Sequence, residues 1–333
     1  MMSESGRMAA RVVLIGFDGL EPPSEAREVL RRGVSQVILF NRNLGPGGTD
    51  VAATCRAIHA AAGEPVAIAV DQEGGRVARL SAAHGLTPVP PMRQIGALGP
   101  TAGPLESARV GAQLARELRA LGVGIDFAPV VDVDSNPANP VIGDRSFSDD
   151  PTQAARCAAS FITALQAGGV AACAKHFPGH GDTDTDSHLT LPRLRHGLAR
   201  LEQIELPPFA AAIAAGVASI MTAHVVFEAI DPRAPATMSH AVVTGLLRQK
   251  LGFNGLIYSD CLEMQAISDG WETGAAAVAS IAAGCDTVLV CHRHDRQHAA
   301  IDALDREAAR SSTFAHRLRE AAARVDALLA RVR

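Results

Sequence analysis

The segment 175–188 concentrates side chains that could move protons or bind a metal ion. It reads Lys-His-Phe-Pro-Gly-His-Gly-Asp-Thr-Asp-Thr-Asp-Ser-His. Asp182, Asp184 and Asp186 occupy every second position, as aspartates do at the start of a calcium-binding loop. However, Ser187 stands at the sixth position of that loop, where glycine makes the turn, and Arg193 stands at the twelfth, where a glutamate binds the ion. These two mismatches argue against calcium.

The three histidines of the segment, His176, His180 and His188, offer a second interpretation as zinc ligands. Zinc-binding histidines four residues apart usually lie on one face of a helix. The proline and glycines between these histidines prevent a helix there. We therefore predict no metal site and no cofactor.

Asp186 and His188 fit a third interpretation, that of a catalytic dyad. A carboxylate beside an imidazole orients the ring and stabilises its protonated form. A histidine whose pKa stays near ~6.5 can donate a proton at neutral pH and accept one in a later step. The structural alternative is that His188 is an ordinary exposed loop histidine.

Two other apolar runs are followed by polar residues that could take part in catalysis or binding. Asp260 follows the run 256–259, where a carboxylate suits nucleophilic attack or, alternatively, caps the following helical turn. Lys175 and His176 directly follow the run 170–174, and a charged amine at the end of a buried strand needs a partner. That partner is either Asp71 in an internal ion pair or a hydroxyl group of a ligand, and both can hold at once.

Eight short apolar runs are expected to position these side chains. Most are continuous and rich in β-branched residues, as strands buried on both faces should be. Helical patterns separate the runs, so the strands should be parallel, and eight repeats close into a barrel. We predict one α/β domain, a single (β/α)8 TIM barrel, over residues 1–333. The expected strands are 12–15, 36–40, 66–70, 123–133, 170–174, 218–222, 256–259 and 287–290, and the expected helices include 51–62, 105–121, 152–167, 202–215, 241–250 and 273–283.

Polar residues end nearly every run. Because barrel active sites lie at the C-terminal ends of the strands, these residues predict a site at one mouth of the barrel. We expect Asp71, Lys175 and Asp260 to converge there, with Asp132 and His224 orienting other groups, and we assign no role to His292. The full set is Asp18, Asn41 with Arg42, Asp71, Asp132, Lys175 with His176, His224, Asp260 and His292.

Composition excludes several classes of protein. The residues are 47% hydrophobic and 20% charged, which is typical of a globular protein, and no apolar run is long enough to span a bilayer. The start of the chain lacks a secretory apolar segment, so we expect a cytoplasmic location. The net charge is -4, without Lys/Arg clusters, so nucleic acid is not an expected partner. Six widely spaced cysteines indicate reduced thiols.

These motifs together resemble the bacterial β-N-acetylglucosaminidases of glycoside hydrolase family 3. The resemblance extends from the first expected strand to the last, and the segment 175–188 carries most of it. The other matching pieces are Asp-Gln-Glu-Gly-Gly-Arg-Val at 71–77, Phe-Ala-Pro at 127–129, Gly-Asp-Arg-Ser-Phe at 143–147 and Tyr-Ser-Asp at 258–260.

The resemblance implies a role for each matching residue. Asp260 corresponds to the nucleophile, and His188, supported by Asp186, corresponds to the acid/base. Cys261 departs from the family pattern, since many relatives carry a second aspartate there, so details of that loop are expected to differ. The residues implied to bind the sugar are Asp71, Arg79, Arg145, Lys175 and His176.

The implied activity is removal of terminal β-linked N-acetylglucosamine with retention, through a covalent glycosyl-aspartate. Two-domain β-glucosidases of the same family take their acid/base from a following domain, which we do not expect in this chain. The implied partner is a small carbohydrate, and cell-wall muropeptides are the implied natural source.

Three other functions fit the same motifs. A phosphorylase could use the same histidine, because a histidine tolerates an incoming phosphate that a carboxylate would repel. A β-glucosidase would prefer aryl glucosides. A non-catalytic sugar-binding barrel would not require both Asp260 and the Asp186–His188 pair.

Overall fold

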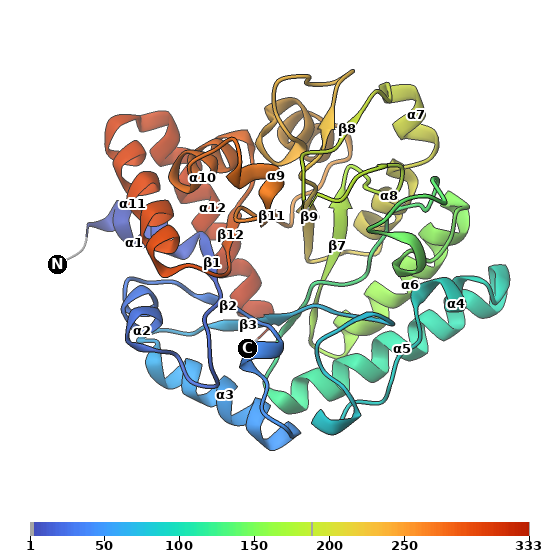
Figure 1. Cartoon of the computed structure of the whole chain (residues 1–333), viewed down its shortest axis with the longest axis horizontal. Helices are drawn as coiled ribbons and strands as arrows, with labels where there is room; N and C mark the ends of the chain where they lie inside the picture. Colours follow the sequence, from blue (N-terminus) through green and yellow to red (C-terminus); the bar gives the residue numbers. More distant parts are fainter. Residues whose placement is uncertain (1–2, 188, 333) are drawn as a thin grey trace.

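A closed barrel of eight parallel strands forms the centre of the molecule, surrounded by helices (Figure 1). The computed structural model describes residues 3–187 and 189–332. The predicted (β/α)8 barrel is confirmed. Around the barrel the order is β1 (Val13–Ile15), β12 (Thr287–Val290), β11 (Leu256–Cys261), β9 (Ser219–Thr222), β7 (Ala171–Phe177), β6 (Ile125–Asp126), β3 (Ala67–Val70) and β2 (Gln36–Leu39).

Side chains from the strands fill the interior of the barrel. Leu14, Ile38, Tyr258 and Leu289 belong to one buried apolar cluster. Leu328, near the end of the last helix α12 (Ser312–Arg331), packs into the same cluster. Since barrel interiors are packed rather than open, ligands can enter only at a mouth.

The surrounding helices bury apolar side chains against the rest of the molecule, as Phe161, Ile162 and Leu165 of the helix 151–167 do. Helix α6 shows how such a helix begins: the Asp150 side chain accepts a hydrogen bond from the Thr152 N–H, and Pro151 occupies the first turn. The helices are α1 (Glu4–Arg11), α2 (Ser24–Arg31), α3 (Gly48–Ala61), α4 (Met92–Gly96), α5 (Gly99–Leu121), α6 (Pro151–Ala167), α7 (Leu198–Gln203), α8 (Leu206–Ala214), the π-helix η5 (Ala241–Lys250), α9 (Gln265–Ser268), α10 (Thr273–Ala283), α11 (His294–Arg310) and α12.

Two expected elements differ from the structure. The strand expected over 123–133 is reduced to β6, because Pro129 has no N–H to continue the ladder; Val130 then forms an isolated bridge to Lys175. The helix expected over 202–215 is divided into α7 and α8. Prolines in the first turn of α8 favour a new helix start over a continuous helix.

Two small sheets lie outside the barrel. Strands β4 (Gln72–Gly74) and β5 (Val77–Ala78) form a hairpin directly after β3, whereas β8 (Arg193–Leu194) pairs with β10 (Val226–Phe227). Both sheets belong to loops that follow barrel strands. We propose that residues 1–333 form one catalytic domain.

Across residues 3–187 and 189–332, no helix is both long and apolar enough to cross a bilayer.

Candidate active site

A cavity of about 280 Å³ opens among the C-terminal ends of the barrel strands. As expected, Asp71, Lys175 and Asp260 converge there, although Asp71 directly follows β3 and the other two lie on β7 and β11. His188 lies outside the described residues. The other residues that the sequence analysis named as catalytic or sugar-binding all line this cavity: Asp71, Arg79, Arg145, Lys175, His176, Asp186 and Asp260.

The β4–β5 hairpin brings acidic and basic side chains to one side of the cavity. Gly74 has a φ of 100°, and a Cβ atom there would lie 2.7 Å from Val89 Cγ1. Only glycine fits this turn without displacing its neighbours. Glu73 and Arg79, on opposite sides of the turn, both face the cavity as a result.

Five charged side chains form a largely buried network. Lys175 Nζ lies 2.8 Å from Asp71 Oδ1 and 2.7 Å from Glu73 Oε1. Arg145 binds Glu73 through two parallel hydrogen bonds of 2.8 Å each. Arg79 lies 3.4 Å from the second oxygen of Asp71. The Lys175–Asp71 pair expected from the sequence is therefore present, and it is part of a larger arrangement.

Burial and pairing act in opposite directions on these charges. Burial alone would raise the pKa of Glu73, but Arg145 and Lys175 outweigh it and hold that pKa well below its usual range. Burial would lower the pKa of Lys175, but Asp71 and Glu73 raise it instead. Both groups are therefore charged at neutral pH. Their side chains are only 1% and 3% exposed, so the network offers strong, fixed hydrogen-bonding groups to a ligand.

Asp132 holds the turn that follows β7. One of its oxygens lies 2.8 Å from His176 Nδ1, and its carboxylate also accepts the backbone N–H groups of His176 and His180. Burial would raise the pKa of Asp132, but His176 and these hydrogen bonds lower it. The expected orienting role of Asp132 matches this geometry, because His176 faces the cavity in a fixed position.

The loop after β7 packs closely against the rest of the mouth. A Cβ atom at Gly181 would overlap the carbonyl oxygen of Val133, so glycine is required for this approach. His180 lies between Thr183 Oγ1 and Ser187 Oγ, each 2.9 Å from a ring nitrogen. Burial, followed by the nearby His176, lowers the pKa of His180 to about 4. This histidine is neutral at pH 7.

The aspartates of this loop have separate environments. Asp182 lies 2.5 Å from His196 Nε2 and accepts a hydrogen bond from Ser135, whereas Asp186 lines the cavity. Among the described residues, these aspartates form no cluster with metal-ligand spacing. The structure therefore places Asp186, and not Asp182, beside the site.

Asp260 lies near the end of β11, at the cavity wall. The Cys261 N–H donates a hydrogen bond of 2.7 Å to Asp260 Oδ1. His224 Nε2 lies 3.0 Å from the Cys261 carbonyl oxygen and thereby helps to fix this strand end. Hydrogen bonding to Cys291 and His292 lowers the pKa of the Cys261 thiol to about 6, against the effect of burial.

Sequence reasoning missed some residues of the cavity wall, and five residues of its predicted set are absent from that wall: Asp18, Asn41, Arg42, Asp132 and His224. Glu73 was part of a matching motif but received no role, although it joins Lys175 to Arg145. His292 also received no role, yet it lines the cavity. Asp18 and Arg42 instead form an ion pair of 2.7 Å outside the wall.

Comparisons with known proteins agree with the motif resemblance. The chain is 42% identical over 286 residues to a β-hexosaminidase of Xanthomonas oryzae pv. oryzae, with 84% of each protein covered. It is 38% identical to β-hexosaminidase A of Pseudoalteromonas piscicida, covering 81% of this chain and 48% of that protein. A solved family 3 β-N-acetylglucosaminidase from Paenibacillus sp. has a TM-score of 0.93 and 41% identity, covering 100% of this chain and 63% of that one.

The chain thus spans about half the length of the Pseudoalteromonas protein and less than two thirds of the Paenibacillus one. The family model for the glycosyl hydrolase family 3 N-terminal domain matches residues 11–328. That match includes every barrel strand and every described residue of the cavity wall. The chain therefore belongs to glycosyl hydrolase family 3.

Proposed function

We propose that this chain is a retaining exo-β-N-acetylglucosaminidase, acting through a covalent glycosyl-Asp260 and a His188 acid/base. The observation that carries the proposal is the convergence of Asp260 and Asp186 on one cavity with the Lys175–Asp71–Arg79 group. The β-hexosaminidase and β-N-acetylglucosaminidase names of the relatives support the choice of sugar.

The cavity suits one terminal sugar. Its volume of about 280 Å³ lies near the lower end of the range for small-molecule pockets. Aspartate and arginine side chains in the wall provide acceptors and donors for adjacent hydroxyl groups. Hydroxyl groups of a bound sugar can accept hydrogen bonds from Arg79 and Arg145 and donate to Asp71, and the small size of the cavity favours removal of end residues over cleavage within a chain.

The reaction has two displacements. The Asp260 carboxylate attacks the anomeric carbon while the bond to the leaving oxygen breaks, and protonated His188 donates its proton to that oxygen. The neutral imidazole then removes a proton from water, whose oxygen attacks the anomeric carbon and releases Asp260 as a carboxylate. Asp186 stabilises the protonated imidazole.

A small panel of aryl glycosides tests the activity. We expect turnover of the aryl N-acetylglucosaminide and little turnover of the aryl glucoside. Phosphate should neither accelerate the reaction nor yield sugar 1-phosphate. The opposite phosphate result would identify a phosphorylase, and no turnover of any member would support a binding barrel.

Covalent labelling tests the nucleophile. A fluorinated slow substrate should trap the glycosyl-enzyme, and peptide mass mapping should find the label on Asp260. Rapid turnover by Asp260→Ala would refute the assignment, because the reaction would then proceed without this carboxylate.

We propose that the natural source of the sugar is cell-wall muropeptide fragments and that the protein acts in the cytoplasm, as the family resemblance implies. Comparing turnover of purified muropeptides with that of chitin oligosaccharides checks the substrate, and cell fractionation checks the location.

A further inference from the structure

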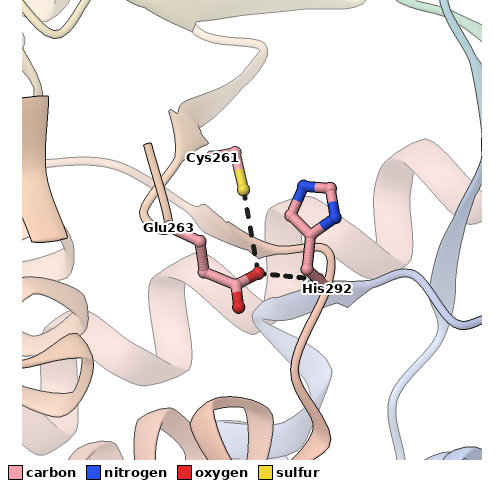
Figure 2. Close-up of side chains that lie close together, drawn as sticks. All are labelled: Cys261, Glu263 and His292. Atoms are coloured by element: carbon pink, nitrogen blue, oxygen red, sulfur yellow. Dashed lines mark hydrogen bonds between the residues drawn. The ribbon is translucent and has the colours of Figure 1, made fainter. Parts of the chain in front are cut away.

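Three side chains beside Asp260 gather without any part in the proposed reaction. Cys261 is the last residue of β11, Glu263 lies two residues further on, and His292 lies two residues after β12. Their potential ligand atoms, one from each residue, lie within 4.8 Å of one another. Figure 2 shows the Cys261 and Glu263 side chains turned toward each other, with the His292 ring beside them.

The three side chains also have structural contacts, since the His292 ring lies 5.4 Å from the Phe40 ring between centroids and Glu263 binds the loop backbone. Glu263 accepts hydrogen bonds from the backbone N–H groups of His292, at 2.6 Å, and Arg293, at 3.0 Å. These bonds hold the two strand ends together, but a carboxylate could do so without a thiol 3.9 Å from its oxygen. They also fix the carboxylate in place, as hydrogen bonds around a metal ligand do.

The donor set selects the kind of ion. A thiol sulfur, an imidazole nitrogen and a carboxylate oxygen are the three ligand types that zinc accepts in proteins, whereas magnesium and calcium prefer oxygen alone. Three protein ligands leave a fourth position in a tetrahedral site. Because Cys261 and His292 also line the cavity, water or substrate can reach an ion held there.

We propose that Cys261, Glu263 and His292 form a zinc-binding site at the rim of the cavity, and that Zn²⁺ bound there inhibits sugar turnover. The inhibition follows from the position of Cys261, whose backbone N–H donates to Asp260 Oδ1. A cation held by the Cys261 thiolate reduces the readiness of the adjacent carboxylate to attack carbon. This part rests on the proposed function, whereas zinc binding does not.

Metal binding is tested on the purified chain after removal of metals with a chelator. Calorimetric titration should show a single bound Zn²⁺, and Co²⁺ should give the near-ultraviolet absorption of a thiolate ligand. Cys261→Ser should lose that absorption, and both Cys261→Ser and His292→Asn should weaken zinc binding by at least ~10-fold, the smallest loss usual even for groups outside the ligand set. Cys157→Ser, which alters a buried thiol in the outer helix α6, is the matched control and should retain both signals.

A further variant separates this site from the catalytic residues. Asp260→Asn should still bind zinc and keep the cobalt–thiolate absorption. Loss of zinc binding in Asp260→Asn together with full binding in Cys261→Ser would overturn the proposal and place the ion on the catalytic groups. Unchanged affinity in both Cys261→Ser and His292→Asn would overturn it as well.

Inhibition is measured relative to each variant's own zinc-free rate. Zinc should slow the unaltered chain reversibly, and His292→Asn should require at least ~10-fold more zinc for the same effect. Zinc bound with the cobalt–thiolate signature but without inhibition would overturn the inhibitory part. If the unaltered chain turns over no glycoside, the proposed function fails while the binding titration still decides the site.

Discussion

Glu73 and its neighbours show why buried charges occur in this cavity. A buried carboxylate is unfavourable unless it is paired, and Glu73 meets both Lys175 and Arg145 at hydrogen-bonding distance. The network fixes both cations at the wall where a sugar would lie. Glu73 therefore sets the positions of Lys175 and Arg145 and keeps them charged, although it need not touch the reacting atoms itself.

Glu73→Gln should destabilise the protein and weaken substrate binding together. The substitution removes the carboxylate partner of buried Arg145 and leaves Lys175 with Asp71 alone, so we expect the free energy of unfolding to fall by about 3 kcal/mol. Urea unfolding measures this loss, and KM for an aryl N-acetylglucosaminide should rise. Asp144→Asn breaks the half-exposed pair with Arg76 and should cost less than about 1 kcal/mol. Equal small losses in both variants would contradict the argument.

Asp186→Asn should slow substrates according to their leaving groups. The proposed acid is most important when the leaving oxygen is basic, so turnover of poor leaving groups should fall by at least ~10-fold while an activated phenolate is nearly unaffected. Initial rates on a series of aryl N-acetylglucosaminides measure how the rate loss depends on the leaving group. Asp184→Asn is the matched control, since Asp184 lies on the same loop, is exposed and does not line the cavity. A uniform loss across the series would identify Asp186 as a binding residue instead.

Much of the barrel could be predicted because its elements follow from local patterns. Continuous apolar runs locate the strands, and polar residues at their ends locate the mouth. The hairpin β4–β5 could not be predicted in this way, because two short strands carry too little pattern. The role of Glu73 depends on this hairpin. Likewise, Cys261 lies near His292 because β11 and β12 are neighbours in the barrel. The local sequence around either residue does not predict that proximity.

A histidine in the loop between β7 and β8 should make the stability of the folded protein depend on pH. His180 is held neutral by burial and by the nearby His176, and its two ring nitrogens meet Thr183 and Ser187. Its pKa falls from 6.5 to about 4 on folding, so the unfolded chain binds the proton more tightly. The resulting stability is present above pH 6.5 and is lost as pH falls toward 4.

Lowering the pH from 6.5 to 4 should therefore reduce the free energy of unfolding by about 3 kcal/mol through this histidine. His180→Gln cannot titrate, so its own loss over the same range should be smaller by that amount. Urea unfolding at several pH values measures both curves. Parallel curves for the two proteins would show that His180 does not provide this dependence.

The two ends of the barrel hold different sets of polar residues. The C-terminal mouth holds the cavity, whereas Asp286, just before β12, lies buried near the other end. Its carboxylate accepts hydrogen bonds from Ile257 N–H, Arg248 and Arg317. These partners belong to β11, η5 and α12, so one side chain joins the barrel to two of its outer elements. Groups at this end of a barrel contribute to stability rather than to the site.

Asp286→Ala should accordingly lower stability without altering catalysis by the folded protein. Its removal leaves several arginines without their shared buried partner, for which we expect a loss of about 3–5 kcal/mol in the free energy of unfolding. Below the unfolding transition, kcat/KM per folded molecule should equal that of the unaltered chain, because the cavity wall contains none of these residues. Asp302→Ala, which breaks the partly exposed pair with Arg32, should cost under about 1 kcal/mol. A fall in kcat/KM of Asp286→Ala at temperatures where circular dichroism shows full folding would mean that the two ends of the barrel are coupled.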